Sequence, residues 1–339
     1  MNGTPQDGAS AVKRARPFIL LAILGVIVLV GSIFIGRYPA PYWMSPSSLW
    51  HDELGRRLVL YLRLPRIMTA FLMGMSLSAA GTVMQTVFRN PLVCAGFLGV
   101  SQGAAFGAAL SIIFFSASVI AIELSATVFA LLALVFAYLL AWNIRYGDWV
   151  LRLVLAGIIS SAIFSSGIGV LKYAADPLEE LPSIVFWLMG GLWGVTWREF
   201  FYVLPLAATS LIVLYFLRWR LNLLALRDDT AFSLGVSPFR ERAVALCAAV
   251  VGTAVVVAVA GIVGWIGLIV PHMTRRIVGP DVGRVLPASM LLGGTLALIC
   301  DNIARTLYAG EIPLGIVTSL IGSLVFITMF FRNELRVKQ

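Results

Sequence analysis

The sequence predicts an all-α membrane protein with ten transmembrane helices, and three observations support this fold class. Hydrophobic residues make up 60% of the 339 residues and charged residues only 12%, whereas a water-soluble domain is about half apolar and a quarter charged. The mean hydropathy is +0.95. Apolar runs long enough to cross a bilayer core, about 20 residues each, recur along the chain. A soluble globular fold is therefore excluded.

The first predicted span is the uncharged run 18–36, which follows a polar and basic tail at residues 1–17. A cleaved signal peptide has a shorter apolar region of about 7 to 15 residues. We therefore expect a retained span with its basic tail in the cytosol, and cleavage is the less favoured alternative. Seven further apolar runs predict spans at 67–87, 95–115, 121–142, 150–171, 199–217, 287–303 and 312–331.

The stretch 243–278 is too long for a single span. It is interrupted by four residues that break helices, Gly261, Gly264, Gly267 and Pro271. We interpret it as two spans joined by a glycine-rich break, which brings the count to ten. An even count keeps both basic termini in the cytosol, and it makes 218–242 the largest cytosolic loop. Residues 1–339 then form one transmembrane domain.

Two longer segments, 37–66 and 172–198, are expected on the outer face. Five arginines nevertheless occur in the first of them: Arg37, Arg56, Arg57, Arg63 and Arg66. This cluster departs from the positive-inside pattern and calls for a functional explanation. In the second segment, the apolar run 183–189 is too short to span and predicts an interfacial or re-entrant helix.

Composition and motifs exclude several functions. The net charge is +9, but basic residues in a membrane protein report orientation, so no nucleic-acid partner is expected. None of the three lysines follows a glycine, so a phosphate-binding loop for ATP hydrolysis is absent from the sequence. The two histidines and three cysteines lack metal-ligand spacing. We expect no catalytic residues, no metal site and no cofactor bound by this chain.

Acidic residues are nearly absent from the predicted spans. Ion-coupled transporters usually keep carboxylates in mid-span, whereas Glu123 and Asp301 lie near span ends and are expected at the water interface. Asp301 precedes Arg305 by four residues, which is the favourable order for a helical ion pair. An ion-coupled or facilitative transporter remains the alternative function.

Small residues form a stripe in the predicted span 150–171. Such a stripe favours close helix packing, and the alternative is that part of it lines a translocation pathway. The candidate lining residues are Ser161 and Ser165, together with Met189 of the outer segment. A weak internal echo is also present, because ten residues separate Gly81 from Pro91 and Gly261 from Pro271. If the two stretches are equivalent, they form an inverted-topology repeat, as found in many transporters.

The cytosolic loop 218–242 has an apolar side formed by Leu221, Leu223, Leu224, Leu226, Phe232 and Leu234. Gly235 and Pro238 end its helical part. A short amphipathic helix can rest on the protein's own core or enter the groove of a partner. Because the chain lacks an ATPase signature, the loop suggests a partner chain that supplies the energy.

Six motifs occur in order along the chain: LRLPR at 62–66, AAGTVMQTVFRNPL at 79–92, LGVSQGA at 98–104, LNLLALRDDTAFSLGV at 221–236, GWIGLIVPH at 264–272 and EIPLGIVTSLIG at 311–322. With these motifs the chain resembles the FecCD-type permeases from residue 63 to about residue 332. Those permeases are the membrane subunits of type II ABC importers for iron chelates, haem, cobalamin and related solutes.

The resemblance implies an inverted-repeat permease fold in a bacterial or archaeal cytoplasmic membrane. It also implies a homodimer, two cytosolic ATPase subunits that use ATP and magnesium, and an extracytoplasmic binding protein. An iron-siderophore is the implied substrate, while haem, cobalamin and a molybdate-type oxyanion remain open.

The resemblance also assigns residues to sites. Arg63, Arg66 and Arg305 correspond to arginines that dock the binding protein, and Asn90, Leu92 and Val150 to the cytoplasmic gate. Relatives can have small hydroxyl residues near the last position, where this chain has Trp149, Val150 and Leu151. The coupling loop to the ATPase comprises Leu221, Leu226, Arg227, Asp228, Ala231, Leu234 and Gly235.

Overall fold

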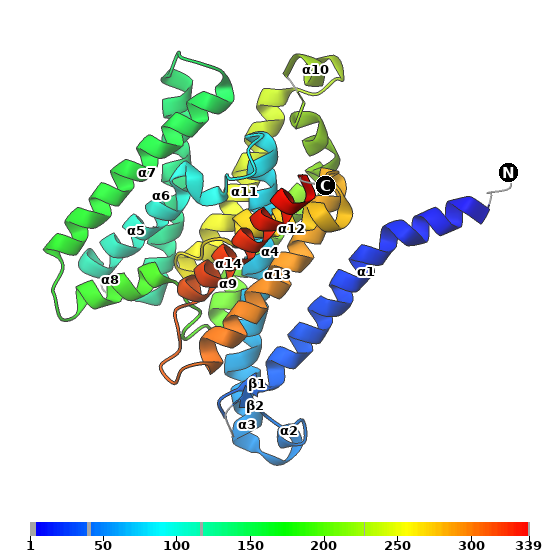
Figure 1. Cartoon of the computed structure of the whole chain (residues 1–339). Coiled ribbons are helices and arrows are strands. Elements are labelled where there is room, and N and C mark those ends of the chain that lie inside the picture. Colours follow the sequence, from blue (N-terminus) through cyan, green and yellow to red (C-terminus); the bar gives the residue numbers. More distant parts are fainter. Residues whose placement is uncertain (1–4, 39–41, 116–117, 227, 338–339) are drawn as a thin grey trace.

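The computed structural model describes residues 5–38, 42–115, 118–226 and 228–337, and these are helical almost throughout (Figure 1). Ten helices correspond to the ten predicted spans: α1 (Pro5–Phe34), α4 (Leu64–Val87), α5 (Val100–Phe114), α6 (Val119–Asn143), α7 (Trp149–Ala174), α9 (Trp197–Leu224), α11 (Pro238–Ala260), α12 (Ile266–Val278), α13 (Val282–Thr306) and α14 (Leu314–Val337). Among the described residues, seven of these helices are long and apolar enough to cross a membrane by themselves. Helices α5, α12 and α14 complete the set; α5 and α12 are shorter, and the apolar part of α14 ends at Met329.

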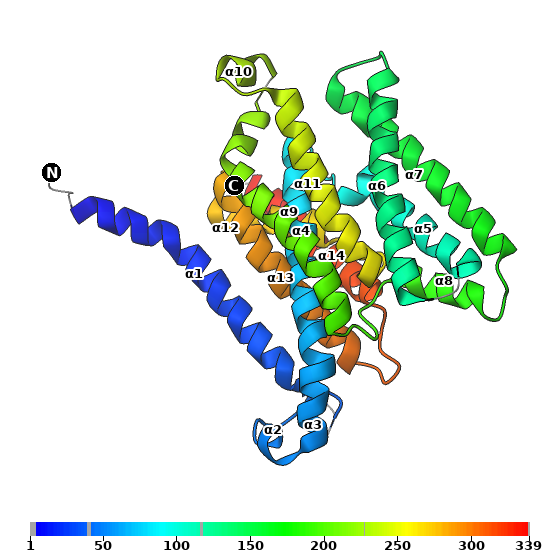
Figure 2. The same cartoon turned by 180° about the vertical axis from the view of Figure 1, so that it is seen from behind.

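The two ends of the bundle differ (Figures 1 and 2). Helix α10 (Asp228–Ser233) lies at one end, and the described start of α1 and the end of α14 lie toward that side. Helices α3 (Glu53–Leu58) and α8 (Glu180–Met189) lie toward the opposite end. Following the predicted orientation, we call the α10 end the inner face and the α3 end the outer face.

Helix α4 occupies the centre of the bundle, between α9, α11, α12 and α13. Small residues allow this close packing. A Cβ atom on Gly81 would overlap the carbonyl oxygen of Gly267 in α12, and one on Gly74 would overlap that of Gly293 in α13. Glycine at these two contacts therefore sets the distance between α4 and its neighbours. Helices α5, α6 and α7 form a separate group beside this centre (Figure 1).

The break predicted between two spans in 243–278 is confirmed. Helix α11 ends at Ala260 and α12 begins at Ile266, with Gly261 at φ +66° and Trp265 at φ +69° in between. Glycine is required at the first position because a Cβ atom there would overlap the carbonyl oxygen of Trp187. The apolar run 183–189 is also helical, as predicted, within α8.

The residues of the weak internal echo occupy different places in their elements, and the inverted repeat itself stays a prediction. Gly81 lies inside α4, whereas Gly261 lies in the break after α11. Pro91 follows α4 in a loop, whereas Pro271 lies inside α12.

The second span differs most from its prediction. Helical structure runs without interruption from Glu53 to Val87 over 35 residues, through α3, a π-helical turn η1 (Val59–Arg63) and α4. At about 1.5 Å per residue this length is about 50 Å, well beyond the roughly 30 Å hydrocarbon core. The excess projects at the outer face beside α2 (Ser48–His51) and the hairpin β1 (Ile35–Gly36) and β2 (Tyr42–Trp43) (Figure 1). The arginines before residue 67 lower the local hydropathy, so this part was not predicted as a span, but arginine is a good helix former and the helix continues through them.

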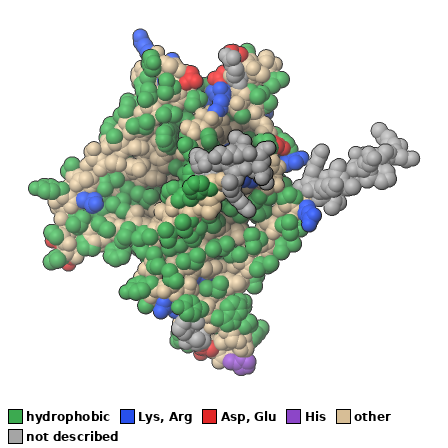
Figure 3. Space-filling model, in the orientation of Figure 1, with side chains coloured by type: hydrophobic (Ala, Val, Ile, Leu, Met, Phe, Trp, Pro, Cys, Tyr) green, Lys and Arg blue, Asp and Glu red, His purple; other side chains and the backbone are tan. Residues whose placement is uncertain are grey.

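Other boundaries also shift. The predicted span 95–115 is divided into η2 (Ala95–Leu98) and α5, because Gly99 adopts φ +80° between them. At the inner face, α9 extends to Leu224 and α11 begins at Pro238, so the cytosolic loop is shorter than predicted. Hydrophobic side chains dominate the visible surface between the two ends (Figure 3), as a lipid-facing surface requires.

Candidate functional site

A cavity of about 370 Å³ opens at the outer face, between the end of α1, the start of α4, the segment after α8 and the end of α13. Its charged lining residues are Arg37, Arg63, Arg66, Arg305 and Glu311. The three predicted docking arginines, which come from three separate sequence positions, therefore lie around one cavity. Four guanidinium groups against one carboxylate give the cavity a positive lining.

Arg66 is held by two carboxylates. Its Nε donates to Oδ1 of Asp301 at 2.9 Å, and its Nη1 donates to Oε2 of Glu311 at 2.9 Å. The side chain of Arg66 is 12% exposed and that of Asp301 is fully buried. Arg305 Nε lies 3.7 Å from the other oxygen of Asp301, so the helical pair expected from the sequence is present. Glu311 was not predicted as a partner, because nothing in its local sequence points to α4.

The expected position of both span-end acids at the water interface is wrong. Asp301 is fully buried, and Glu123, near the start of α6, is 6% exposed. Closeness to a helix end does not bring a side chain to water where neighbouring helices extend past that end. Arg66 and Arg305 supply opposite charges, which offset the energetic cost of burying the Asp301 carboxylate.

Arg63 and Arg305 fasten the outer end of α1 to the bundle. Arg63 donates to the carbonyl oxygens of Ile33 at 2.9 Å and Tyr38 at 2.8 Å. Arg305 donates to the carbonyl oxygen of Ser32 at 2.6 Å. Both guanidinium groups are thus engaged within the chain, and their contact with a partner's carboxylates stays a prediction. Arg37, which was not among the predicted docking residues, lines the same cavity and is exposed.

At the inner face, Asp228 ties α10 to two spanning segments. Its carboxylate accepts hydrogen bonds from Arg242 of α11 at 2.6 and 2.9 Å, and from Arg89, just after α4, at 3.1 Å. The hydrogen bonds from Arg242 hold the pKa of Asp228 below its usual range. This tie therefore stabilises the fold above the unfolded-state pKa, near 4, and is lost as the pH falls through the folded-state value.

The predicted coupling residues divide between two faces. Leu221 and Ala231 are buried against the protein, whereas Leu226 and Leu234 are exposed, and Phe232 beside them is 73% exposed. Gly235 ends the segment with φ +80°. Arg227, which was also predicted, lies outside the described residues. Leu221 belongs to α9, so α10 itself is shorter than the predicted coupling helix.

The predicted gate residues lie at inner ends of helices. Asn90 Oδ1 accepts a hydrogen bond from the backbone nitrogen of Leu92 at 2.9 Å, and both residues are exposed. Val150 lies in the first turn of α7 and is half-buried. Beside it, the Trp149 ring packs edge-on against Phe239 at 5.3 Å between centroids. Their role as a gate stays a prediction.

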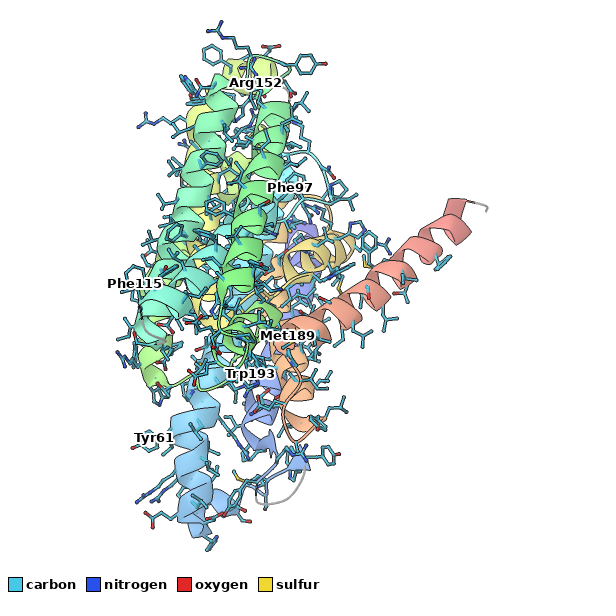
Figure 4. The ribbon with its side chains drawn as sticks, turned by 90° about the vertical axis from the view of Figure 1, so that its left-hand side faces the viewer. Tyr61, Phe97, Phe115, Arg152, Met189 and Trp193 are labelled. Atoms are coloured by element: carbon cyan, nitrogen blue, oxygen red, sulfur yellow. The ribbon has the colours of Figure 1, made fainter. Side chains whose placement is uncertain are left out.

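The small-residue stripe of α7 serves packing along only part of its length. A Cβ atom on Gly157 would overlap the carbonyl oxygen of Phe97, and Ser160 is buried. Ser161 is half-buried and Ser165 is exposed. Figure 4 faces this side of the molecule, with Arg152 near the upper end of α7 and Met189 at the end of α8 below. Met189 is half-buried, and pathway lining by Ser161, Ser165 and Met189 stays a prediction.

The family model of the FecCD transport family matches residues 21–332. The molybdate import system permease protein MolB of Haemophilus influenzae is 40% identical, with 92% of this chain and 94% of that protein covered. The iron(3+)-hydroxamate import system permease protein FhuG of Bacillus subtilis is 33% identical, with 94% and 98% covered.

A solved structure agrees with these relatives. It is an inward-facing conformation of a metal-chelate type ABC transporter, and it is 37% identical with a TM-score of 0.86. The alignment covers 93% of this chain and 98% of the solved chain. The family match, the relatives and the fold together make this chain a member of the FecCD transport family and a multi-pass permease subunit of an ABC importer.

Proposed function

We propose that two copies of this chain form the translocation pathway of an importer driven by two cytosolic ATPase subunits. The observation that carries the proposal is α10 with its flanking residues. Phe232 of α10 and the adjacent Leu226 and Leu234 are exposed at the inner face, while Asp228 ties α10 to Arg89, just after α4, and to Arg242 of α11. An exposed apolar helix suits a partner groove. The ion pair between Asp228 and Arg89 would transmit a displacement of α10 to the central helix α4.

The ATPase subunits would bind ATP and magnesium, which this chain needs no residues to hold. A second copy of the chain would cover the open side of α7, where Ser165 and Gly169 are exposed and nothing lies near Gly169. Small residues at that position suit either close packing of helices or a pathway wide enough for a bulky solute. Both termini would lie in the cytosol, because the described ends of α1 and α14 lie toward the α10 side (Figure 1).

At the outer face, the arginine-lined cavity would receive carboxylates of an extracytoplasmic binding protein. Guanidinium groups recognise carboxylates with fixed geometry, and charge complementarity mainly speeds encounter. Arg63, Arg66 and Arg305 set the positive lining, and exposed Arg37 offers donors at the rim.

The proposed substrate is a metal chelate, with an iron-siderophore as the first candidate. A molybdate-type oxyanion is the second, favoured by the 40% identity to a molybdate permease. Uptake of a radiolabelled iron-hydroxamate and of radiolabelled molybdate into cells with and without the chain distinguishes them. Uptake of only one label, lost on deletion, identifies the class.

The assembly is tested by purifying the tagged chain in mild detergent from its native host, followed by mass spectrometry and sizing. A complex with two copies of this chain and two of an ATPase is expected. A chain that purifies without an ATPase and still moves solute in liposomes would instead favour the ion-coupled or facilitative alternative.

Leu234→Asp is expected to release the ATPase. Leu234 directly follows α10 and is exposed beside Phe232, and a charge placed there would have to enter the partner's groove, which is costly. The measurement is the amount of ATPase retained on the tagged chain, and at least a tenfold loss is expected. Leu178→Asp is the matched control, because Leu178 is exposed near the outer end of α7. Equal retention by both variants would reject the assignment of α10.

Arg37→Glu is expected to weaken docking of the binding protein. The exposed side chain lines the arginine cavity, so reversal of its charge lowers attraction without breaking the buried pairs of Arg66. We expect a slower association rate with a reduced dependence on salt, measured by surface plasmon resonance on the reconstituted complex. Arg145→Glu, exposed near the inner face, is the control. Identical association rates for the two variants would contradict this role of the cavity.

A further inference from the structure

A second cavity, of about 420 Å³, opens at the inner face between the ends of α4 and α12 and the start of α13. Its polar lining residues are Gln85, Thr86, Arg89, Asn90, His272 and Arg275. Among the described residues that line it there is no carboxylate. Two guanidinium groups, one imidazole and two amides therefore converge on a space of ligand size.

The charge of Arg275 lacks an acidic partner. Its Nη1 donates to Oε1 of Gln85, a neutral acceptor. Gln85 is itself fixed, since its Nε2 donates to the carbonyl oxygen of Leu268 at 3.0 Å and the residue is 3% exposed. None of the ion pairs in the described part of the chain includes Arg275. A half-buried cation without a counter-ion favours an external anion.

The carboxylates in neighbouring segments are already committed. Asp228 accepts from Arg242 and Arg89. Asp281, in the loop before α13, accepts from Asn222 at 2.7 Å and from the backbone nitrogen of Gly283 at 2.9 Å. Asp281 also pairs with Arg284. These contacts leave Arg275 as the cation that an added anion would neutralise.

We propose that this cavity is an anion site for a tetrahedral oxyanion of the phosphate and molybdate class. Arg275 and Arg89 would supply paired N–H donors, which match tetrahedral oxyanions. His272 would add a ring donor. Asn90 Oδ1 is already used by the backbone of Leu92, which leaves its amide nitrogen as a donor. The same chemistry is offered by a free oxyanion in the cytosol and by the phosphate of an anionic lipid.

Arg89 both lines this cavity and contacts α10, so an anion bound in the cavity would affect α10. Arg89 donates to Asp228 and to the carbonyl oxygen of Leu226. It adopts φ +50°, an uncommon conformation for a residue other than glycine. An anion that draws Arg89 into the cavity competes with these contacts and changes the hold on α10. This consequence rests on the proposed function, whereas the binding itself does not.

The experiment is thermal unfolding of the purified full chain, with inorganic phosphate or molybdate titrated against chloride at constant ionic strength. In nanodiscs of phosphatidylcholine alone, the midpoint should rise with the oxyanion concentration, as mass action requires. Arg275→Gln should weaken the apparent affinity about tenfold or more, because a charged hydrogen-bond donor is lost. Arg275→Lys should weaken it less. The control is Arg276→Gln, whose parent side chain donates to the carbonyl oxygen of Met329.

If the bound anion is the phosphate of a lipid, the unfolding midpoints should change differently. Phosphate and molybdate would then have no effect in phosphatidylcholine, whereas nanodiscs with phosphatidylglycerol would raise the midpoint of the wild type and the Arg276→Gln variant but not of Arg275→Gln. Either pattern supports the site. It is overturned if no oxyanion or anionic lipid shifts the wild type more than Arg275→Gln, or if Arg276→Gln loses as much as Arg275→Gln. Where Arg275→Gln does not fold, Arg275→Lys carries the same comparison.

Discussion

Gly81→Ala is expected to prevent normal packing of α4 against α12. The added Cβ would overlap the backbone carbonyl oxygen of Gly267, and a backbone atom cannot turn aside as a flexible side chain can. Overpacking of a core costs about 1–3 kcal/mol, whereas alanine recovers at most about 1 kcal/mol of helix propensity. We expect a clear loss of folded protein in fluorescence-detected size-exclusion chromatography and a lower unfolding midpoint.

Gly31→Ala is the matched control for this substitution. Gly31 also lies inside a helix, α1, and a Cβ atom there would have no neighbour within 4 Å. This variant should match or slightly exceed the wild type, because only the propensity gain applies. Equal unfolding midpoints for the Gly81 and Gly31 variants would contradict the close approach of α4 and α12 at Gly81.

Asp301→Ala is expected to destabilise the outer end of the bundle strongly. The carboxylate is fully buried and lies 2.9 Å from Arg66 and 3.7 Å from Arg305. Its removal leaves two buried guanidinium groups with Glu311 as the remaining acid of the cluster. Removal of one partner from a buried pair costs about 3–5 kcal/mol, which corresponds to a fall in the unfolding midpoint of about 4–7 °C for a chain of 339 residues.

Two comparisons separate charge from packing at this position. Asp301→Asn keeps the side-chain volume, so it should lose nearly as much stability if charge dominates. Glu53→Ala removes an ion pair whose two side chains are 65% and 68% exposed, and should cost about 0–1 kcal/mol. If the alanine variants at 301 and 53 had equal midpoints, the buried cluster would not hold α1, α4 and α13 together.

Much of the fold was predictable because hydropathy and glycine patterning are local. The order of the ten spans and the break between α11 and α12 follow from apolar runs and from Gly261. The long helix from Glu53 to Val87 was missed for the same reason. Hydropathy reports transfer to lipid and not helix formation, so a charged helix outside the membrane resembles a loop.

The sequence allowed some residues of the candidate site to be named, but it did not allow their contacts to be predicted. Arg63, Arg66 and Arg305, which were grouped from the sequence as docking residues, line one cavity, and their docking role stays a prediction. The partners of Arg66, however, lie 235 and 245 residues away, and no local pattern links positions so far apart. Burial of Glu123 and Asp301 was missed because it depends on how far neighbouring helices extend. The basic inner cavity was not predicted because its lining comes from four separate chain segments.

We propose that this chain moves its solute only with an ATPase partner. The most direct measurement is uptake of the identified solute by proteoliposomes that contain the purified complex and its binding protein. We predict accumulation that requires ATP and the binding protein, and that falls to background with Leu234→Asp. Accumulation by the chain alone, driven by an ion gradient and unaffected by ATP, would contradict the account.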